Sequence, residues 1–150
     1  MERYNPRGAA KVALTPEQVQ LVKDSYSLIC KHSEPYSILF YHQLFLKHPF
    51  VRALFPDELT HQTSVFRQTI DVLVENIADL ARMRPTLATL ARQHVQYGVD
   101  TYQYAIVGAV LIDTFAEILE SRFTSEARKA WEAVYAETAA IMISESSTGH

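Results

Sequence analysis

Helix breakers are scarce in this chain, and that scarcity restricts the folds open to it more than any other feature. Only 4 Gly and 6 Pro occur in 150 residues. Between them, apolar side chains recur every three or four residues, which places them on one face of an α-helix. The first segment shows the pattern at Val19, Val22, Tyr26 and Ile29. Since no segment alternates as a half-buried strand does, the sequence predicts an all-α fold.

The proline and glycine positions divide this pattern into about seven helices. Thr15 can cap a helix that begins at Pro16, because proline loses nothing at the first helical position. A long helical pattern follows residue 60 and is expected to stop at Pro85. One domain is expected over residues 15–144, between a flexible N-terminal extension, 1–14, and a polar tail, 145–150.

Charge and composition exclude several classes of protein. The chain has 14 Lys+Arg against 17 Asp+Glu and no basic run, so we expect no nucleic-acid partner. Its one cysteine, Cys30, cannot form an internal disulfide. The most apolar stretch, Tyr102 to Ile112, is far shorter than the ~20 residues that span a bilayer. With no secretory signal visible, the expectation is a cytoplasmic protein without membrane partners.

Sequence motifs for common catalytic sites are absent, and His94 is the residue that remains. No two of the 6 histidines have the i, i+4 spacing of a helical zinc site, and no phosphate-binding loop or nucleophile elbow occurs. Haem requires one histidine on a helix and a largely apolar slot. His94 lies in a short helical segment before Gly98, with several aromatic residues upstream. Taken alone, such a histidine is more often a surface or core residue without a ligand role.

Five separated segments together resemble a known family. They are Phe40-Tyr41-x-x-Leu44-Phe45-x-x-His48-Pro49, Leu54-Phe55, the stretch from Ala91 to Val99, Tyr104 to Gly108, and Trp131-x-x-x-Tyr135. In this order they are similar to bacterial globins, above all to the haem domain of flavohaemoglobins and to single-domain bacterial haemoglobins. The resemblance extends from about Leu14 to Ile143. It implies a globin fold, a three-on-three helical sandwich around a pocket for haem b.

On the proximal side, the resemblance implies that His94 is the iron ligand. Its Nε2 would bind the metal while its Nδ1–H finds an acceptor. Leu90, one turn earlier, would pack against the porphyrin. Tyr104 matches the tyrosine that flavohaemoglobins place behind this histidine. Glu145 is the nearest candidate for their accompanying glutamate, although it falls one residue short of the family spacing and is equally consistent with a solvated tail.

On the distal side, the resemblance implies that Phe55 packs against the haem edge and that Tyr41 donates a hydrogen bond to bound O₂. Counting from Phe55 across the loop, and back from Asn76-Ile77, gives Gln62 as the second residue facing the ligand. A one-residue slip would put His61 there instead. The pocket would be completed by Phe66, Val99 and Val107.

The resemblance implies a haem protein that binds O₂ with high affinity, and also NO and CO. Two donors above the iron imply slow O₂ release, which suits conversion of NO to nitrate, the dioxygenase activity for which flavohaemoglobins are known. Since the chain ends after the globin helices, turnover would need a separate flavin or NAD(P)H reductase. Dimers occur in this family, so a homodimer is one assembly that the resemblance allows.

Two other functions stay open at this point. One is oxygen storage or gas sensing without catalysis. The other is a globin-like interaction module that lacks haem. The joint presence of His94, Phe55, Tyr41 and Gln62 speaks against this last alternative, because a haem-free domain has no physical need for that combination.

Overall fold

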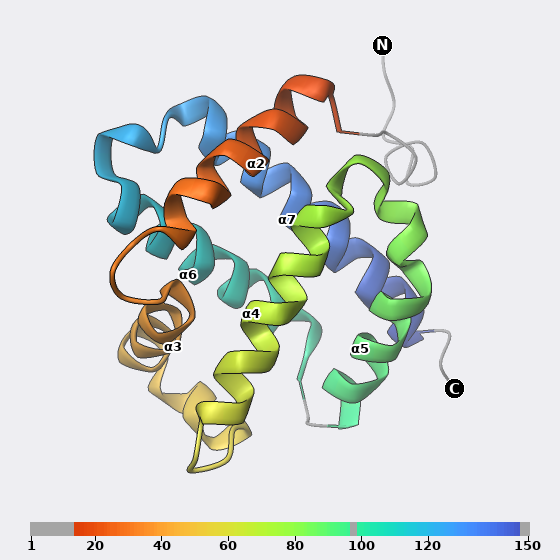
Figure 1. Ribbon diagram of the computed structural model, residues 1–150. Coiled ribbons are helices and arrows are strands. Elements are labelled where there is room, and N and C mark those ends of the chain that lie inside the picture. The colour runs from red at the N-terminus through yellow and green to blue at the C-terminus, as the bar shows by residue number, and fades with distance from the viewer. Residues whose placement is uncertain (1–13, 97–98, 148–150) are drawn as a thin grey trace.

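The chain folds into helices joined by short connections, as the computed structural model shows for residues 14–96 and 99–147 (Figure 1). The expected extension, residues 1–14, therefore lies almost wholly outside the described residues, as do Tyr97 and Gly98. Within the described residues there are α-helices and 3₁₀ helices and no strands. The α-helices are α2 (Pro16–Cys30), α3 (Tyr36–Lys47), α4 (Thr60–Glu75), α5 (Arg84–Gln96), α6 (Thr101–Leu119) and α7 (Ser125–Ser147), and the 3₁₀ helices are η1 (Pro49–Leu54), η2 (Ile77–Met83) and η3 (Glu120–Arg122). The all-α prediction is confirmed.

The helix starts follow from local chemistry. The Thr15 side chain accepts a hydrogen bond from the Gln18 N–H, and the Gln18 side chain accepts one from the Thr15 N–H, so α2 begins with the expected capping box. Asp100 and Gln103 form the same arrangement at the start of α6. Each box supplies acceptors for backbone N–H groups that have no partner inside the helix.

The long pattern after residue 60 is interrupted earlier than predicted. α4 ends at Glu75, and its cap residue Asn76 donates a side-chain hydrogen bond to the Val72 carbonyl at 2.9 Å. Asp79 then has non-helical backbone angles, φ −148° and ψ 77°. The apolar spacing continues through this break because η2 still buries Ile77 and Leu80. Pro85 therefore lies in the first turn of α5, where proline is tolerated, rather than at the end of α4.

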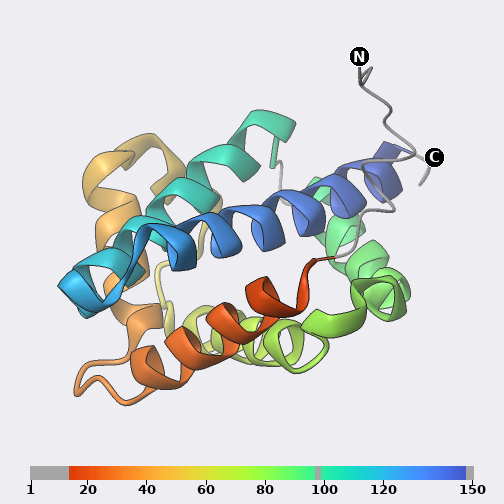
Figure 2. The ribbon, with the colours of Figure 1, turned by 90° about the horizontal axis from the view of Figure 1, so that it is seen from above.

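Two groups of helices enclose the core. Seen from above, α6 and α7 run along one side and α2 and α4 along the other, with α3 and α5 at opposite ends (Figure 2). Between them lie fully buried side chains that include Trp131, Phe40 and Phe115. The Trp131 indole N–H donates to the Ser25 hydroxyl at 2.9 Å, which satisfies its polar atom inside the core. α7 continues through Glu145 to Ser147, beyond the start of the expected tail.

Among the described residues, none of the helices is long and apolar enough to cross a membrane.

Candidate functional site

Three aromatic residues predicted for the pocket meet around Tyr41. The Tyr41 ring lies 5.5 Å from that of Phe55 and 5.6 Å from that of Phe66, both edge to face. Tyr41 is on α3, Phe66 on α4, and Phe55 follows η1. Tyr41 is buried, whereas both phenylalanines are only partly buried and keep exposed surface. The fold thus gathers these rings from three segments.

Phe55 is held in place by a residue that sequence reasoning missed. The Arg52 guanidinium donates hydrogen bonds to the carbonyl oxygens of Phe55 at 3.2 Å and Pro56 at 2.9 Å. It also lies over the Phe45 ring at 5.1 Å from the centroid. The Phe45 ring in turn packs on Tyr41 and Phe55. Arginine is usually a surface residue, so the sequence does not indicate that Arg52 holds this loop in place.

The first turn of α4 brings a glutamine to Tyr41. The Gln62 side chain lies within hydrogen-bonding reach of the Tyr41 hydroxyl, and this contact acts to lower the pKa of Tyr41. His61, the alternative, is exposed. Burial raises the pKa of Tyr41 well above its usual range, and the Gln62 hydrogen bond opposes that rise only in part. Tyr41 therefore keeps its proton and remains a hydrogen-bond donor at neutral pH.

His94 lies in the last turn of α5 and is half-buried. Its Nδ1 is 2.6 Å from the carbonyl oxygen of Leu90. A carbonyl only accepts hydrogen bonds, so Nδ1 carries a proton and donates it, and in the neutral ring Nε2 then holds the lone pair. This is the tautomer that binds iron through Nε2, with a backbone carbonyl as the orienting partner.

Behind His94, two tyrosines from α6 and α7 form a support. The Tyr104 ring is stacked on the His94 ring, with centroids 5.9 Å apart and planes inclined by 18°. The Tyr135 hydroxyl donates to the Tyr104 carbonyl oxygen at 2.5 Å. Burial raises the pKa of both tyrosines. The sequence matched Tyr135 to the family's last helix but gave it no role here.

The remaining predicted residues lie at different distances from His94. Glu145 pairs with Arg84 at 2.8 Å. Arg84 precedes His94 by ten residues in α5, or about 15 Å along the helix axis, so this ion pair does not bring Glu145 to the histidine. Leu90 and Val107 are half-buried against the core, and the Val99 N–H donates to the His94 carbonyl at 3.0 Å.

These residues suit haem better than a bare metal ion. The described part of the chain has no group of three His, Cys, Asp or Glu side chains that could hold a metal ion. Haem brings its own ring of nitrogen ligands and asks the protein for one axial nitrogen and apolar walls. Here His94 would supply the nitrogen, and Phe55, Phe66 and Leu90 would supply apolar surface. The N-terminal end of α4 and the C-terminal end of α5 lie at the same end of the molecule (Figure 1).

A groove elsewhere on the surface is a different feature. It has a volume of about 400 Å³ and runs between α6 and α7, lined by Ala105, Ala109 and Ala136 among others. Of the predicted site residues, it includes Tyr104 but neither His94 nor the distal aromatic residues. It is therefore not the candidate haem pocket.

Several known proteins are similar to this chain. The family model described as Globin matches residues 38–142. A Flavohemoprotein from Bordetella parapertussis is 30% identical over 133 residues, which make up 87% of this chain and 33% of that protein. The chain thus spans about a third of the length of this relative. Neuroglobin from Danio rerio is 28% identical over 137 residues, 81% of this chain and 86% of its own.

A solved structure shows the same architecture. The bacterial globin from Campylobacter jejuni matches with a TM-score of 0.79 and 30% identity, covering 89% of this chain and 97% of its own. The expected globin fold is thereby confirmed, and so is the similarity to the globin domain of flavohaemoglobins. Since the family model covers most of the chain as well, the protein belongs to the globin family, whose members bind haem and diatomic gases.

Proposed function

We propose that this globin holds haem b on His94, retains O₂ tightly, and removes nitric oxide by dioxygenation with electrons from a separate flavin or NAD(P)H reductase. The observation that carries the proposal is the cluster that Tyr41 forms with Phe55 and Phe66, with Gln62 within hydrogen-bonding reach of the Tyr41 hydroxyl. Its two polar side chains stand among the aromatic rings of α3 and α4, and both can donate a hydrogen bond.

The Tyr41 hydroxyl and the Gln62 amide both offer donors for the ligand. An amide N–H of Gln62 can donate to the Tyr41 oxygen, which leaves the phenolic O–H unused in that contact. It can donate to a gas molecule, and the second amide hydrogen of Gln62 is a further donor. Donors that are already fixed in position favour a ligand that gains negative charge over one that does not. The donors of Tyr41 and Gln62 would therefore favour O₂, a ligand that draws electron density, over CO.

On the proximal side, neighbouring residues orient the His94 imidazole. The Leu90 carbonyl holds the His94 proton on Nδ1 and makes Nε2 the better donor to a metal. Tyr104 limits rotation of the imidazole by stacking on it. Haem, when bound, supplies a redox-active iron that takes O₂, NO or CO and accepts an electron from a reductase. Around it, Phe55 and Phe66 exclude water and Tyr41 holds O₂ until NO arrives.

Haem binding is tested by absorption spectra of the purified protein in ferric, dithionite-reduced and CO-treated states. We expect the bands of a histidine-ligated CO complex. His94→Ala should abolish stable haem retention, whereas the control His42→Ala, which changes an exposed histidine on α3, should retain it. Normal retention in His94→Ala would refute the proximal assignment. A folded, helical chain that does not take up haem would refute the whole proposal in favour of an interaction module.

The dioxygenase activity is tested by following NO consumption under air with an NAD(P)H-dependent flavin reductase present. Repeated turnover to nitrate supports the proposal. The second candidate, reversible oxygen storage or sensing, rests on the same donor pair and predicts one equivalent of NO consumed per haem even with the reductase. Stoichiometric reaction alone would therefore replace the first function by the second.

A further inference from the structure

Three pairs of side chains define how α3 and α4 cross. Tyr41 lies within hydrogen-bonding reach of Gln62, and the Phe40 and Phe66 rings stack with centroids 4.5 Å apart and planes inclined by 10°. At the third, the Arg67 guanidinium lies over a tyrosine ring of α3, Tyr36, 5.3 Å from its centroid. From the first pair to the third, the residue numbers decrease along α3 and increase along α4. The first and third pairs are five residues apart on each helix, about 7.5 Å along each axis.

Arg67 lies beside the helix face that bears the site residues. Gln62 and Phe66 are one turn apart and share a face of α4, whereas Arg67 is about 100° further round the helix from Phe66. A contact at the side of the face opposes rotation of the helix about its axis. The same rotation would carry the Gln62 side chain away from Tyr41.

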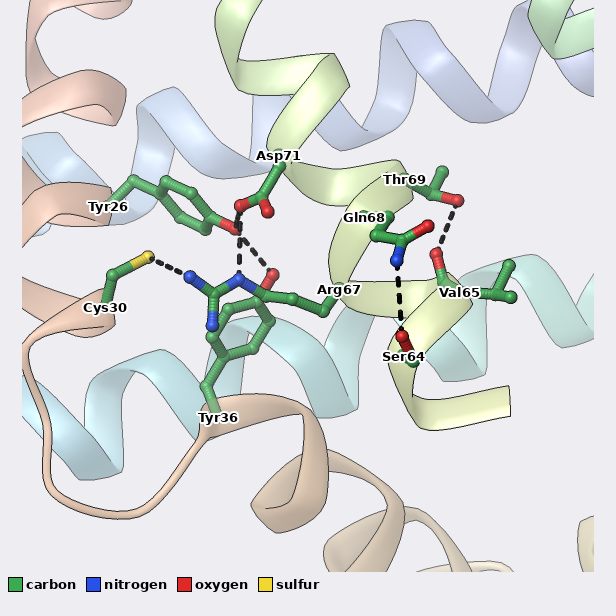
Figure 3. A network of polar contacts seen from close by, with 9 residues as sticks. All are labelled: Tyr26, Cys30, Tyr36, Ser64, Val65, Arg67, Gln68, Thr69 and Asp71. Carbon is green, nitrogen blue, oxygen red and sulfur yellow. Dashed lines mark hydrogen bonds and ion pairs between the residues drawn. The ribbon is translucent and has the colours of Figure 1, made fainter. Parts of the chain in front are cut away.

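Arg67 is itself held by α2 (Figure 3). Its guanidinium donates to the Cys30 sulfur at 3.4 Å and to the Asp71 carboxylate at 3.1 Å. Asp71 also accepts a hydrogen bond from the Tyr26 hydroxyl at 2.5 Å. These contacts join the end of α2 to α4, and the stacking on Tyr36 joins both to the start of α3.

The direction of the hydrogen bonds in this cluster is fixed. The Tyr26 proton goes to Asp71, so the bond of 2.7 Å between the two tyrosine hydroxyls is donated by Tyr36. The hydrogen bonds therefore form a series in which Tyr36 donates to Tyr26 and Tyr26 donates to Asp71. Arg67 donates to the same carboxylate oxygen of Asp71. Both tyrosines are almost fully buried, at 1% and 7% exposure for Tyr36 and Tyr26. A lysine at position 67 could keep a charge near Asp71, but it could not also lie over the Tyr36 ring and donate to the Cys30 sulfur as the guanidinium does.

We propose that Arg67 is a positioning residue for the distal hydrogen bond, acting from the far end of the α3–α4 contact to keep Gln62 against Tyr41. The inference rests on the proposed function, because its readouts are properties of the gas ligand beside that pair. Arg67 touches neither Tyr41 nor the ligand in this scheme. Its effect passes through the rotation of α4.

The test is a double-mutant cycle between Arg67→Lys and Gln62→Leu in the full-length haem protein. Two properties are measured, the O₂ dissociation rate and the C–O stretching frequency of the CO complex, which reports hydrogen-bond donors near the ligand. Arg67→Lys should speed O₂ release about fivefold, the factor expected when one hydrogen bond is largely lost, and shift the C–O frequency in the direction that Gln62→Leu does. In the Gln62→Leu background it should add less than about twofold, because the group on which it acts is gone.

Two further variants separate positioning from general loss of stability. Asp71→Asn keeps Arg67 but weakens its anchor, so it should shift the C–O frequency in the same direction by a smaller amount. Arg128→Lys is the control, since Arg128 forms an ion pair of similar kind with Asp113 at 2.7 Å in a network between α6 and α7. It should leave both properties unchanged.

The outcomes are distinct. If Gln62→Leu changes both properties and Arg67→Lys changes neither, the inference is wrong while the proposed function stands. The inference is also wrong if the two effects multiply in the double variant, or if Arg128→Lys has an effect as large as Arg67→Lys. Failure of the unaltered protein to bind haem would instead refute the proposed function.

Discussion

Gly108 allows a sharp test of how α6 and α7 pack behind the proposed proximal histidine. A Cβ atom built at this position would lie 2.6 Å from Cδ2 of Tyr135 and closer still to its Cε2. Ordinary contact begins at 3.4 Å, so the ring would have to move by about 1 Å in Gly108→Ala. That shift would stretch the 2.5 Å hydrogen bond from the Tyr135 hydroxyl to the Tyr104 carbonyl beyond a useful length.

The expected size of the effect is the sum of three contributions. Overpacking costs about 1–3 kcal/mol, and the lost hydrogen bond about 1 kcal/mol. Alanine gains about 1 kcal/mol in helix propensity. The free energy of unfolding should therefore fall by about 1–3 kcal/mol, and the Tm by about 2–12 °C for a chain of this size.

Thermal and urea unfolding followed by circular dichroism at 222 nm would measure this change. The sign should reverse in a Tyr135→Val background, where no ring occupies the space and only the propensity gain remains. Ala109→Gly, at the next and exposed position of α6, calibrates that propensity. An alanine at 108 that stabilises the protein with Tyr135 intact would show that the ring is not confined as described.

The other predictions concern the ligand, pH and the surface. Tyr41→Phe should speed O₂ release about fivefold or more in stopped-flow displacement by CO, because one donor is lost; an unchanged rate would mean that the hydroxyl does not reach the ligand. Burial raises the pKa of Glu137 above its ordinary value of 4.5, so the folded state binds this proton more tightly than the unfolded state and its ionisation lowers stability as pH rises past that value. Glu137→Gln should accordingly raise the Tm at pH 7 and leave it unchanged at pH 3, and a higher Tm at both would contradict that cause. Arg84→Ala, which breaks an exposed ion pair with Glu145, should lower stability by less than about 1 kcal/mol in urea unfolding, and a larger loss would indicate a role beyond the pair.

Local patterns predicted the helices. The spacing of apolar residues and the cap at Thr15 are properties of neighbouring residues, which is why they could be recognised without the fold. The break after Glu75 could not, because the buried spacing of Ile77 and Leu80 continues across it. Periodicity alone does not distinguish an α-helix from a following 3₁₀ helix that buries the same face.

The candidate site also contains residues that could be predicted from the sequence and residues that could not. The resemblance drew Tyr41, Phe55 and Phe66 together, and the structure places their rings in contact. The contributions of Arg52 and Arg67 were not foreseen, because each depends on carbonyls or rings distant in sequence. The position of Glu145, one residue off the family spacing, was open in the sequence, and its ion pair with Arg84 depends on how α5 meets α7. The roles proposed for these residues await the experiments above.

The packing of α2 has a consequence for the width of the pocket. α5, with His94, packs chiefly on α7 and η2, whereas Tyr41 and Gln62 belong to α3 and α4. α2 contacts both α7 and α4, as well as α6 and η2, and so links the helix that supports α5 to the α4 side of the proposed site. Its side chains Val22 and Ile29 are fully buried. A change in the volume of either residue would therefore shift α4 relative to α7 and alter the spacing between the two sides of the proposed haem site.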